Sequence, residues 1–197
     1  MHTLTSIQTA LSHIKTKRHP ERRALKRSSV VLLLRDGDKG VEVLMMKRAE
    51  REGDPWSGHM AFPGGRQDPG DKSIFATAVR EVREEMGFDI EAVADHALRL
   101  SDIHATGKGR LQPMVVTPFV MFAHSDMSIS PNYEVADYVW IPLQHFMLPA
   151  NRETFEMTYS GVDYTLPCYY YKQFKVWGMS LMMLDELINA LKLHVKD

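Results

Sequence analysis

The sequence has a single cysteine among its 197 residues, Cys168, so no intrachain disulfide can form. A secreted scaffold held together by disulfides is therefore excluded. The sequence also has no apolar run of the roughly 20 residues that a membrane-spanning helix needs, and its first residues lack the apolar core of a secretory signal. With 44% hydrophobic residues it can still form a core. We expect a soluble cytoplasmic protein with no membrane partner.

Net charge is also nearly absent, at −1, which argues against a dedicated nucleic-acid binder. This balance hides two opposed parts. Residues 15–27 carry seven basic residues and one acid, whereas residues 28–197 hold 17 basic and 24 acidic residues, a net of −7. The basic segment is either a solvated linker or a positive surface that attracts an anionic substrate or an RNA backbone.

Ahead of the basic segment, apolar residues recur at helical spacing: Leu4, Ile7, Leu11 and Ile14. They predict a short amphipathic helix over about 4–15, packed on the rest of the chain or on a second subunit, so that a homodimer is one possibility. We expect residues 1–27 to form a helix and a basic arm, and residues 28–197 to form one domain.

The rest of the chain predicts more strands than helices, with the helices set between them. The expected strands cover 28–35, 41–47, 59–62, 98–105, 114–122 and 134–141, with a further hairpin from 154–158 and 164–176 broken at Pro167. The expected helices cover 73–86 and 178–193, the first closed by Gly87 as a left-handed cap. This order indicates an α+β fold with a mixed sheet between helices.

The helix expected over 73–86 carries three carboxylates, Glu81, Glu84 and Glu85, beside its apolar stripe. Like charges at this spacing repel each other by a few tenths of a kcal/mol per pair, and a divalent cation would turn the repulsion into coordination. Hard oxygen ligands suit Mg²⁺ or Mn²⁺. The alternative is a solvated face on which Arg80 pairs with Glu84.

A turn of Pro63, Gly64 and Gly65 precedes this helix. Glycines there suit a backbone that turns sharply and approaches a ligand closely. An exposed carbonyl would add a metal ligand, and the N–H groups would meet a phosphate. The combination of a glycine turn, a loop and a helix lined with carboxylates indicates a functional site more strongly than any one of them.

The segment resembles the signature of the Nudix hydrolases, G-x5-E-x7-R-E-U-x-E-E-x-G-U, in which U is aliphatic. Residues 80–88 match it with Phe88 at the last place, whereas Asp71 stands where the first Glu is expected and the loop holds one extra residue. The resemblance implies an α/β/α sandwich that hydrolyses a nucleoside diphosphate linked to a second group. It also implies a divalent cation held by the three glutamates and the Gly65 carbonyl, with Arg80 orienting the carboxylates.

A second stretch resembles the coenzyme A pyrophosphatase branch of that family. Arg48, Gly58 and the run from Phe62 to Gly65 fit its upstream element, whereas Met46, Glu50 and Asp54 replace Thr, Ala and Arg. The resemblance implies a coenzyme A or acyl-coenzyme A diphosphatase that releases 3′,5′-ADP and 4′-phosphopantetheine. The replaced residues keep ADP-ribose, nucleotide sugars and nucleoside triphosphates as alternative substrates.

Other residues carry weaker expectations. Candidate phosphate contacts are Arg48, Arg66 and Lys108, each of which is otherwise an ordinary surface residue. The family resemblance implies that the general base is Glu81 or a residue outside the signature, such as Glu134, which is otherwise a strand-edge carboxylate. His59, His104 and Cys168 are expected to be structural, and Tyr169 to Tyr171 stay unassigned. A non-catalytic binding module and an enzyme acting on RNA 5′ ends remain as further alternatives.

Overall fold

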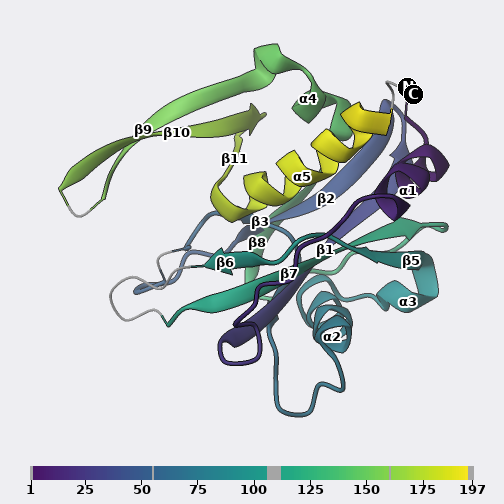
Figure 1. The fold of residues 1–197 in the computed structure, drawn as a ribbon, viewed down its shortest axis with the longest axis horizontal. Coiled ribbons are helices and arrows are strands. Elements are labelled where there is room, and N and C mark those ends of the chain that lie inside the picture. The colour runs from purple at the N-terminus through teal and green to yellow at the C-terminus, as the bar shows by residue number, and fades with distance from the viewer. Residues whose placement is uncertain (1, 55, 106–111, 160, 195–197) are drawn as a thin grey trace.

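The computed structural model describes residues 2–54, 56–105, 112–159 and 161–194. A central sheet lies between two layers of helices, with α2 on one face and α1 and α5 on the other (Figure 1). The strands of the central sheet are β1 (Lys26–Gly37), β2 (Gly40–Arg48), β3 (Met60–Ala61), β4 (Gly64–Arg66), β5 (Ala94–Arg99), β6 (Ile103–Ala105), β7 (Met114–Ala123) and β8 (Val135–Pro142). The helices are α1 (Leu4–Ser12), α2 (Ile74–Met86), α3 (Ile90–Val93), α4 (Leu143–Met147), the 3-10 helix η1 (Pro149–Asn151) and α5 (Gly178–His194).

The sheet is mixed, as the sequence predicted. Its path runs β3-β2-β1-β7-β5, with β4 added to β1, β6 to β7 and β8 to β2. The pair β1 and β7 is parallel, whereas the other pairs are antiparallel. Strand alternation sends Val31 and Leu33 to the α2 side and Leu32 and Leu34 to the side of α1 and α5. Both faces of the sheet are therefore buried, which explains the continuous apolar run of β1.

Helix α1 begins with a reciprocal capping box between Thr3 and Ser6. It ends at Ser12, before the expected limit of residue 15. Its buried residues Ile7 and Leu11 join the apolar cluster that includes α5. The predicted packing of this helix on the rest of the chain is therefore confirmed, whereas a second subunit stays a prediction.

The basic segment after α1 is attached to the loop between β5 and β6. The Lys17 N–H donates to the Ser101 hydroxyl at 2.9 Å, and the Asp102 N–H donates to the Lys17 carbonyl at 2.8 Å. The buried Asp102 carboxylate accepts from the His19 N–H at 2.9 Å and pairs with Arg22 at 3.6 Å. These contacts make the segment part of the folded domain rather than a free linker.

A second sheet of three antiparallel strands, β11-β10-β9, follows the central sheet. Its strands are β9 (Arg152–Tyr159), β10 (Val162–Tyr171) and β11 (Phe174–Trp177). The expected break at Pro167 is wrong, because Pro167 lies inside β10 and pairs with Thr154. Strand β11 pairs with β10 only from Cys168 onward, so Pro167 has a strand on one side alone, a position that tolerates its missing N–H.

Among the residues that the structure describes, no helix is both long enough and apolar enough to pass through a lipid bilayer.

Candidate active site

Helix α2 positions the carboxylates, and local signals define both of its ends. The Ser73 hydroxyl caps the first turn by accepting from the Ala76 N–H at 3.0 Å. Gly87 ends the helix at φ 77°, as predicted, and a Cβ there would lie 2.5 Å from the Ser130 carbonyl oxygen. Ala78 and Val82 are buried against the sheet and fix the helix's rotation about its axis.

The three glutamates of α2 differ sharply in exposure. Glu85 is 2% exposed, the Glu81 side chain is 14% exposed, and the Glu84 side chain is 54% exposed. The prediction that all three adjoin the buried stripe fits Glu81 and Glu85 but not Glu84, which Arg80 holds in solvent. The helix thus directs two of the three carboxylates inward.

The turn at Gly64 and Gly65 approaches these two carboxylates closely. The Gly64 N–H donates to the Glu85 carboxylate at 2.8 Å. A Cβ on Gly64, whose φ is 149°, would lie 2.1 Å from the Ser29 carbonyl oxygen, and one on Gly65 would lie 2.4 Å from a Glu81 carboxylate oxygen. Glycine is therefore required at Gly64, whereas a Cβ at Gly65 would displace the Glu81 carboxylate. The close approach that the turn makes in this structure is to α2.

Arg80 connects the loop to the helix. Its guanidinium donates to both oxygens of Asp71 at 3.0 and 3.1 Å and to the Arg66 carbonyl at 3.0 Å. It also pairs with Glu81 and with Glu84, each at 3.0 Å. The hydrogen bonds from Arg80 lower the pKa of Asp71 to about 2. Asp71, which replaces the expected Glu, therefore anchors Arg80, and Arg80 forms ion pairs with two of the carboxylates.

Burial raises the pKa of Glu85 to about 8, although the Gly64 N–H acts in the opposite direction. Burial also raises the pKa of Glu81, against the opposing effect of Arg80. The two inward carboxylates are hard-oxygen donors of the kind that fits Mg²⁺ or Mn²⁺. Across the described part of the chain, no three Asp, Glu, His or Cys side chains already converge as a metal cluster, because Glu84 is turned toward Arg80.

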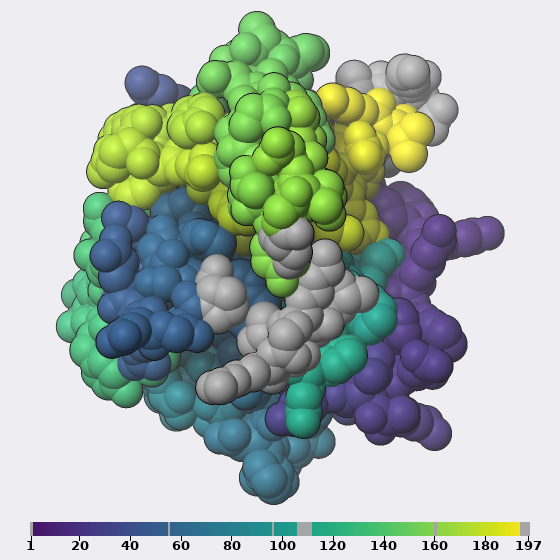
Figure 2. All heavy atoms as spheres, turned by 90° about the vertical axis from the view of Figure 1, so that its left-hand side faces the viewer, coloured from purple at the N-terminus to yellow at the C-terminus, as the bar shows by residue number. Residues whose placement is uncertain are grey.

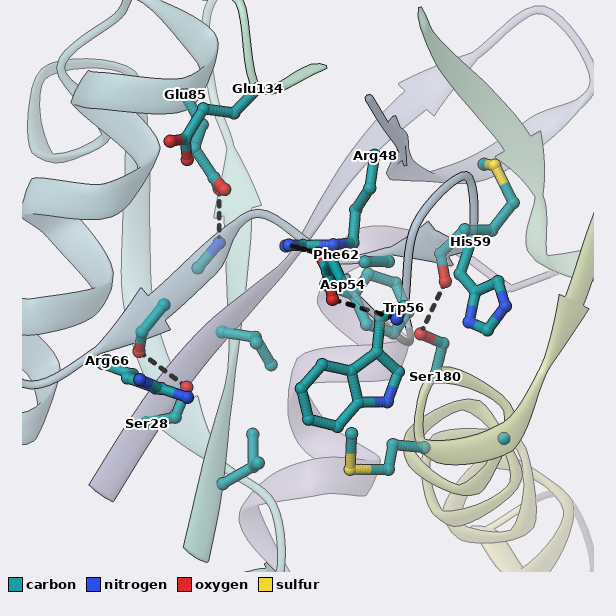
Figure 3. A pocket seen from close by; sticks show the side chains of 18 of the residues that line it. Ser28, Arg48, Asp54, Trp56, His59, Phe62, Arg66, Glu85, Glu134 and Ser180 are labelled. Atoms are coloured by element: carbon teal, nitrogen blue, oxygen red, sulfur yellow. Dashed lines mark hydrogen bonds and ion pairs between the residues drawn. The ribbon is translucent and has the colours of Figure 1, made fainter. Parts of the chain in front are cut away.

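A pocket of about 820 Å³ opens beside these carboxylates. Glu85 and Glu134 lie on its α2 side, Trp56, His59 and Ser180 lie toward α5, and Arg48 and Asp54 lie between the two sides (Figure 3). The pocket therefore has a charged end and an apolar end. The apolar lining comes chiefly from Trp56, Met60, Phe62, Trp177, Met179 and Met183.

Two ion pairs lie at the charged end of the pocket. Arg48 pairs with Asp54 at 2.7 Å, and Asp54 also accepts from the Trp56 N–H at 3.0 Å. Arg51 pairs with Glu134 at 3.0 Å. The structure thus places Arg48 and Glu134 at the pocket, as predicted, but each already has a protein partner. Sequence reasoning missed Arg51, because its partner lies 83 residues away and no local spacing indicates the pair.

The remaining predicted residues are distributed as follows. Arg66 lines the pocket, as does His59, which meets Trp177 edge-on at 4.9 Å. Lys108 lies outside the described residues. The exposed His104 ring lies 4.6 Å from that of His19 in a tilted arrangement. Cys168 is buried, as expected. The tyrosines divide between the faces of β10, since Tyr169 is buried and donates to the Phe146 carbonyl at 3.0 Å, whereas Tyr170 is exposed.

The Met179 and Met183 side chains were also missed as pocket residues. Their helix was predicted from its apolar period, and a period alone does not separate core positions from pocket positions. Only the packing of α5 beside β3 brings these residues to the site, where the Ser180 hydroxyl donates to the Met60 carbonyl at 3.1 Å.

Comparisons with known proteins agree with this arrangement. A family model described as NUDIX domain matches residues 25–159. The chain is 30% identical over 172 residues to a peroxisomal coenzyme A diphosphatase of Mus musculus, covering 85% of this chain and 65% of that protein. It is 29% identical over 174 residues to a mitochondrial coenzyme A diphosphatase of Homo sapiens, covering 86% and 71%. The chain thus spans about two thirds of the length of these relatives.

One solved structure is similar over nearly the whole chain. A MutT/nudix family protein from Enterococcus faecalis aligns with a TM-score of 0.56 and 16% identity, covering 97% of this chain and 70% of that one. At this identity the likeness concerns the fold alone, and it confirms the predicted α+β class with a mixed sheet between helices.

Proposed function

Because the chain belongs to the Nudix hydrolase family, we propose that it hydrolyses the diphosphate bond of coenzyme A or an acyl-coenzyme A. The products would be 3′,5′-ADP and 4′-phosphopantetheine or its acyl derivative. The observation that carries the proposal is the pocket beside Glu81 and Glu85, which joins a charged end to an apolar end. Coenzyme A has the matching chemistry, since its diphosphate lies between a nucleotide and a long arm with apolar stretches.

Two further observations support this substrate. The names of the mouse and human relatives assign the same activity to those proteins. The residues that resemble the coenzyme A element, Arg48 and Phe62, both line the pocket of this chain. The proposed substrate therefore agrees with the activity named for the relatives and with the position of Arg48 and Phe62 at the pocket.

We assign metal binding to Glu81, Glu84, Glu85 and the Gly65 carbonyl. A bound Mg²⁺ or Mn²⁺ would neutralise the diphosphate charge and acidify a bound water. The carbonyl can still act as a ligand while it accepts from the Ser28 hydroxyl at 2.6 Å, because it has two lone pairs. The predicted ligand role of Glu84 requires that its carboxylate turn away from Arg80.

Other residues at the site would position the carboxylates and the substrate and would supply positive charge. Arg80 would hold Glu81 in place through the ion pair at 3.0 Å. Arg48 and Arg66 would contact diphosphate oxygens, and the Gly64 and Gly65 backbone would keep the substrate next to the carboxylates. The general base would be Glu81, with Glu134 as the second candidate, because both line the pocket.

One observation favours a second candidate substrate. Asp54 stands where the coenzyme A element has an arginine, and it neutralises Arg48 at 2.7 Å. The charged end is therefore less positive than that element implies. ADP-ribose or a nucleotide sugar would need fewer positive contacts than coenzyme A, which carries an additional 3′-phosphate.

A substrate panel in ¹⁸O-labelled water tests the proposal. Purified protein with Mg²⁺ or Mn²⁺ would be offered coenzyme A, acetyl-coenzyme A, ADP-ribose, a nucleotide sugar and a nucleoside triphosphate, and the products would be identified by mass. We expect 3′,5′-ADP and the phosphopantetheine product, with ¹⁸O on one of them to identify the phosphorus attacked. Turnover of ADP-ribose without turnover of coenzyme A would contradict the proposal.

The cellular location and assembly stay predictions. The relatives include a peroxisomal and a mitochondrial protein, so fluorescence microscopy of the tagged chain is the test of the cytoplasmic expectation. Light scattering is the test of the possible homodimer.

A further inference from the structure

Strands β9 and β10 form a two-stranded ribbon that extends beyond the central sheet (Figure 1). Their register places apolar residues opposite one another on one face of the ribbon. The three cross-strand pairs are Phe155 with Leu166, Met157 with Tyr164, and Tyr159 with Val162. We call this surface the apolar ribbon face.

The opposite face of the ribbon is polar and internally hydrogen-bonded. The Thr158 hydroxyl pairs with Asp163 at 2.6 Å, and the Thr165 hydroxyl pairs with Glu156 at 2.8 Å. The ribbon is thus amphipathic, with one apolar and one polar face, which is typical of antiparallel strands that pack against an apolar surface on one side. Among the described residues, the outer part of its apolar face is partly open to solvent, since Val162 is 51% exposed and Tyr164 is 38% exposed.

The apolar ribbon face continues into the wall of the catalytic pocket. Strand alternation puts Tyr164, Leu166 and Cys168 on one side of β10, and Cys168 pairs with Trp177 of β11. Trp177 lines the pocket, and its ring meets Phe155 edge-on at 5.1 Å. One apolar surface therefore runs from the pocket, past Trp177 and Phe155, to the tip of the ribbon.

The junction between the pocket and the ribbon carries one positive charge. The Lys175 ammonium lies 3.8 Å from the centroid of the Phe155 ring and 5.8 Å from that of Trp177. Beyond this point, the four residue steps from Phe155 to Tyr159 extend the apolar surface by about 13 Å at the rise of a β-strand. Figure 2 looks toward the tip of the ribbon, with the blue segment that follows β2 below it.

We propose that the apolar ribbon face binds an apolar group that the substrate carries beyond its diphosphate, such as the acyl chain of a coenzyme A thioester. This inference rests on the proposed function. Continuity with the pocket favours this occupant over a second copy of the chain or a lipid surface, because a chain that leaves the pocket past Trp177 meets Phe155 and Leu166 next. The ribbon would therefore set the preference for acyl length.

The experiment compares kcat/KM for free, acetyl-, octanoyl- and dodecanoyl-coenzyme A, each kept below its micelle concentration. The variant M157T/Y164T removes one apolar cross-strand pair but keeps residues that favour strands. The matched control, Thr165→Ala, removes the hydroxyl contact with Glu156 on the polar face. Light scattering on each protein reports its oligomeric state.

For the native chain we expect kcat/KM to rise about tenfold from the acetyl to the dodecanoyl ester, equivalent to burying about two methylene groups. In M157T/Y164T this ratio should fall to about one, with kcat/KM for free coenzyme A within about twofold of the native value. The T165A variant should keep the native ratio.

Three results would overturn the inference. They are a native ratio near one, a ratio that survives in M157T/Y164T, and an equal loss in T165A, which would indicate a purely structural effect. A dimer that M157T/Y164T dissociates would identify a second copy as the occupant and would also overturn it. Failure of the proposed function looks different, because neither coenzyme A nor any ester would then be hydrolysed by any of the three proteins.

Discussion

The Glu85 carboxylate accepts a hydrogen bond from the Gly64 backbone N–H at 2.8 Å, so the inner side of α2 is joined directly to the glycine turn. Glu85 is nearly fully buried, and this N–H is a fixed donor in a place that water does not reach easily. The glycine turn and α2 therefore form one structural unit, and the predictions for Gly64 and Glu85 both involve this contact.

Gly64→Ala should destabilise the protein by more than about 2 kcal/mol. The φ of 149° is accessible only to glycine at low cost, and the new Cβ would lie 2.1 Å from the Ser29 carbonyl oxygen. Urea denaturation measures the change. Gly70→Ala is the control, because no atom lies within 4 Å of its Cβ position. Equal stability of the two variants would show that the turn relaxes freely.

Glu85→Gln should lower kcat at least about a hundredfold while leaving the melting temperature equal or higher. Glutamine keeps an acceptor for Gly64 and removes the cost of burying a charge, which already raises the pKa of Glu85 to about 8. Chelation of divalent cations should abolish the native activity, and Mg²⁺ or Mn²⁺ should restore it. A Glu85→Gln enzyme with native kcat would exclude Glu85 from the reaction.

The Asp71 and Arg80 pair should make stability depend on pH in acid. The folded pKa of Asp71 is about 2, below its ordinary value of 3.8, so the pair stabilises the fold above about pH 4. This contribution disappears as pH falls from about 4 to 2. Thermal unfolding should show Asp71→Asn less stable by about 1 kcal/mol at pH 7, after allowance for solvent screening, and equal to the native protein near pH 2.

The control for that series is Asp68→Asn. Asp68 lies 3.8 Å from the same guanidinium but is mostly exposed, so its loss should change stability little at any pH. If the stability difference between Asp71→Asn and the native protein stayed constant down to pH 2, the ion pair between Asp71 and Arg80 would not be the cause of that difference.

Asp54→Asn should lower KM for an anionic substrate about threefold or more, with kcat within about twofold of the native value. The carboxylate neutralises Arg48 at 2.7 Å and adds negative charge to a pocket that must receive a diphosphate. Asparagine can still accept from the Trp56 N–H. Glu42→Gln, which breaks the remote pair with Arg35 at 2.9 Å, is the control and should leave KM unchanged. An unchanged KM in Asp54→Asn would mean that Arg48 does not contact the substrate.

Asp102→Asn should release the basic segment from the domain. The carboxylate is fully buried, binds the His19 N–H at 2.9 Å and the Thr117 hydroxyl at 2.7 Å, and pairs with Arg22 and Arg99. Without it, two guanidiniums lose their shared anion, so trypsin should cut the segment about tenfold faster or more. Asp95→Asn, at an exposed site on β5, should leave the rate unchanged. Equal rates in all three proteins would place the anchor elsewhere.

Local patterns predicted the elements that local forces define. Helix α2 was predicted from its apolar period, and its ends at Ser73 and Gly87 follow from capping chemistry that acts within a few residues. The short β4, α3 and α4 were missed: α3 and α4 have only four and five residues, and β4 depends on a partner far along the chain. Strand β4, for example, exists only because it pairs with β1. Pro167 was read as a break since its sequence neighbours do not reveal that β11 leaves it unpaired on one side.

By itself, the sequence determined the family signature, the order of the main elements and the choice of carboxylates for the site, because these depend on residue type and spacing along one helix. The tertiary structure alone decided which carboxylates are buried, that Arg80 binds Asp71, and that Asp54 neutralises Arg48. It also brought Trp177 and the apolar ribbon face to the pocket. Burial and ion pairing depend on distances between segments that packing brings together, and no spacing within one segment encodes those distances.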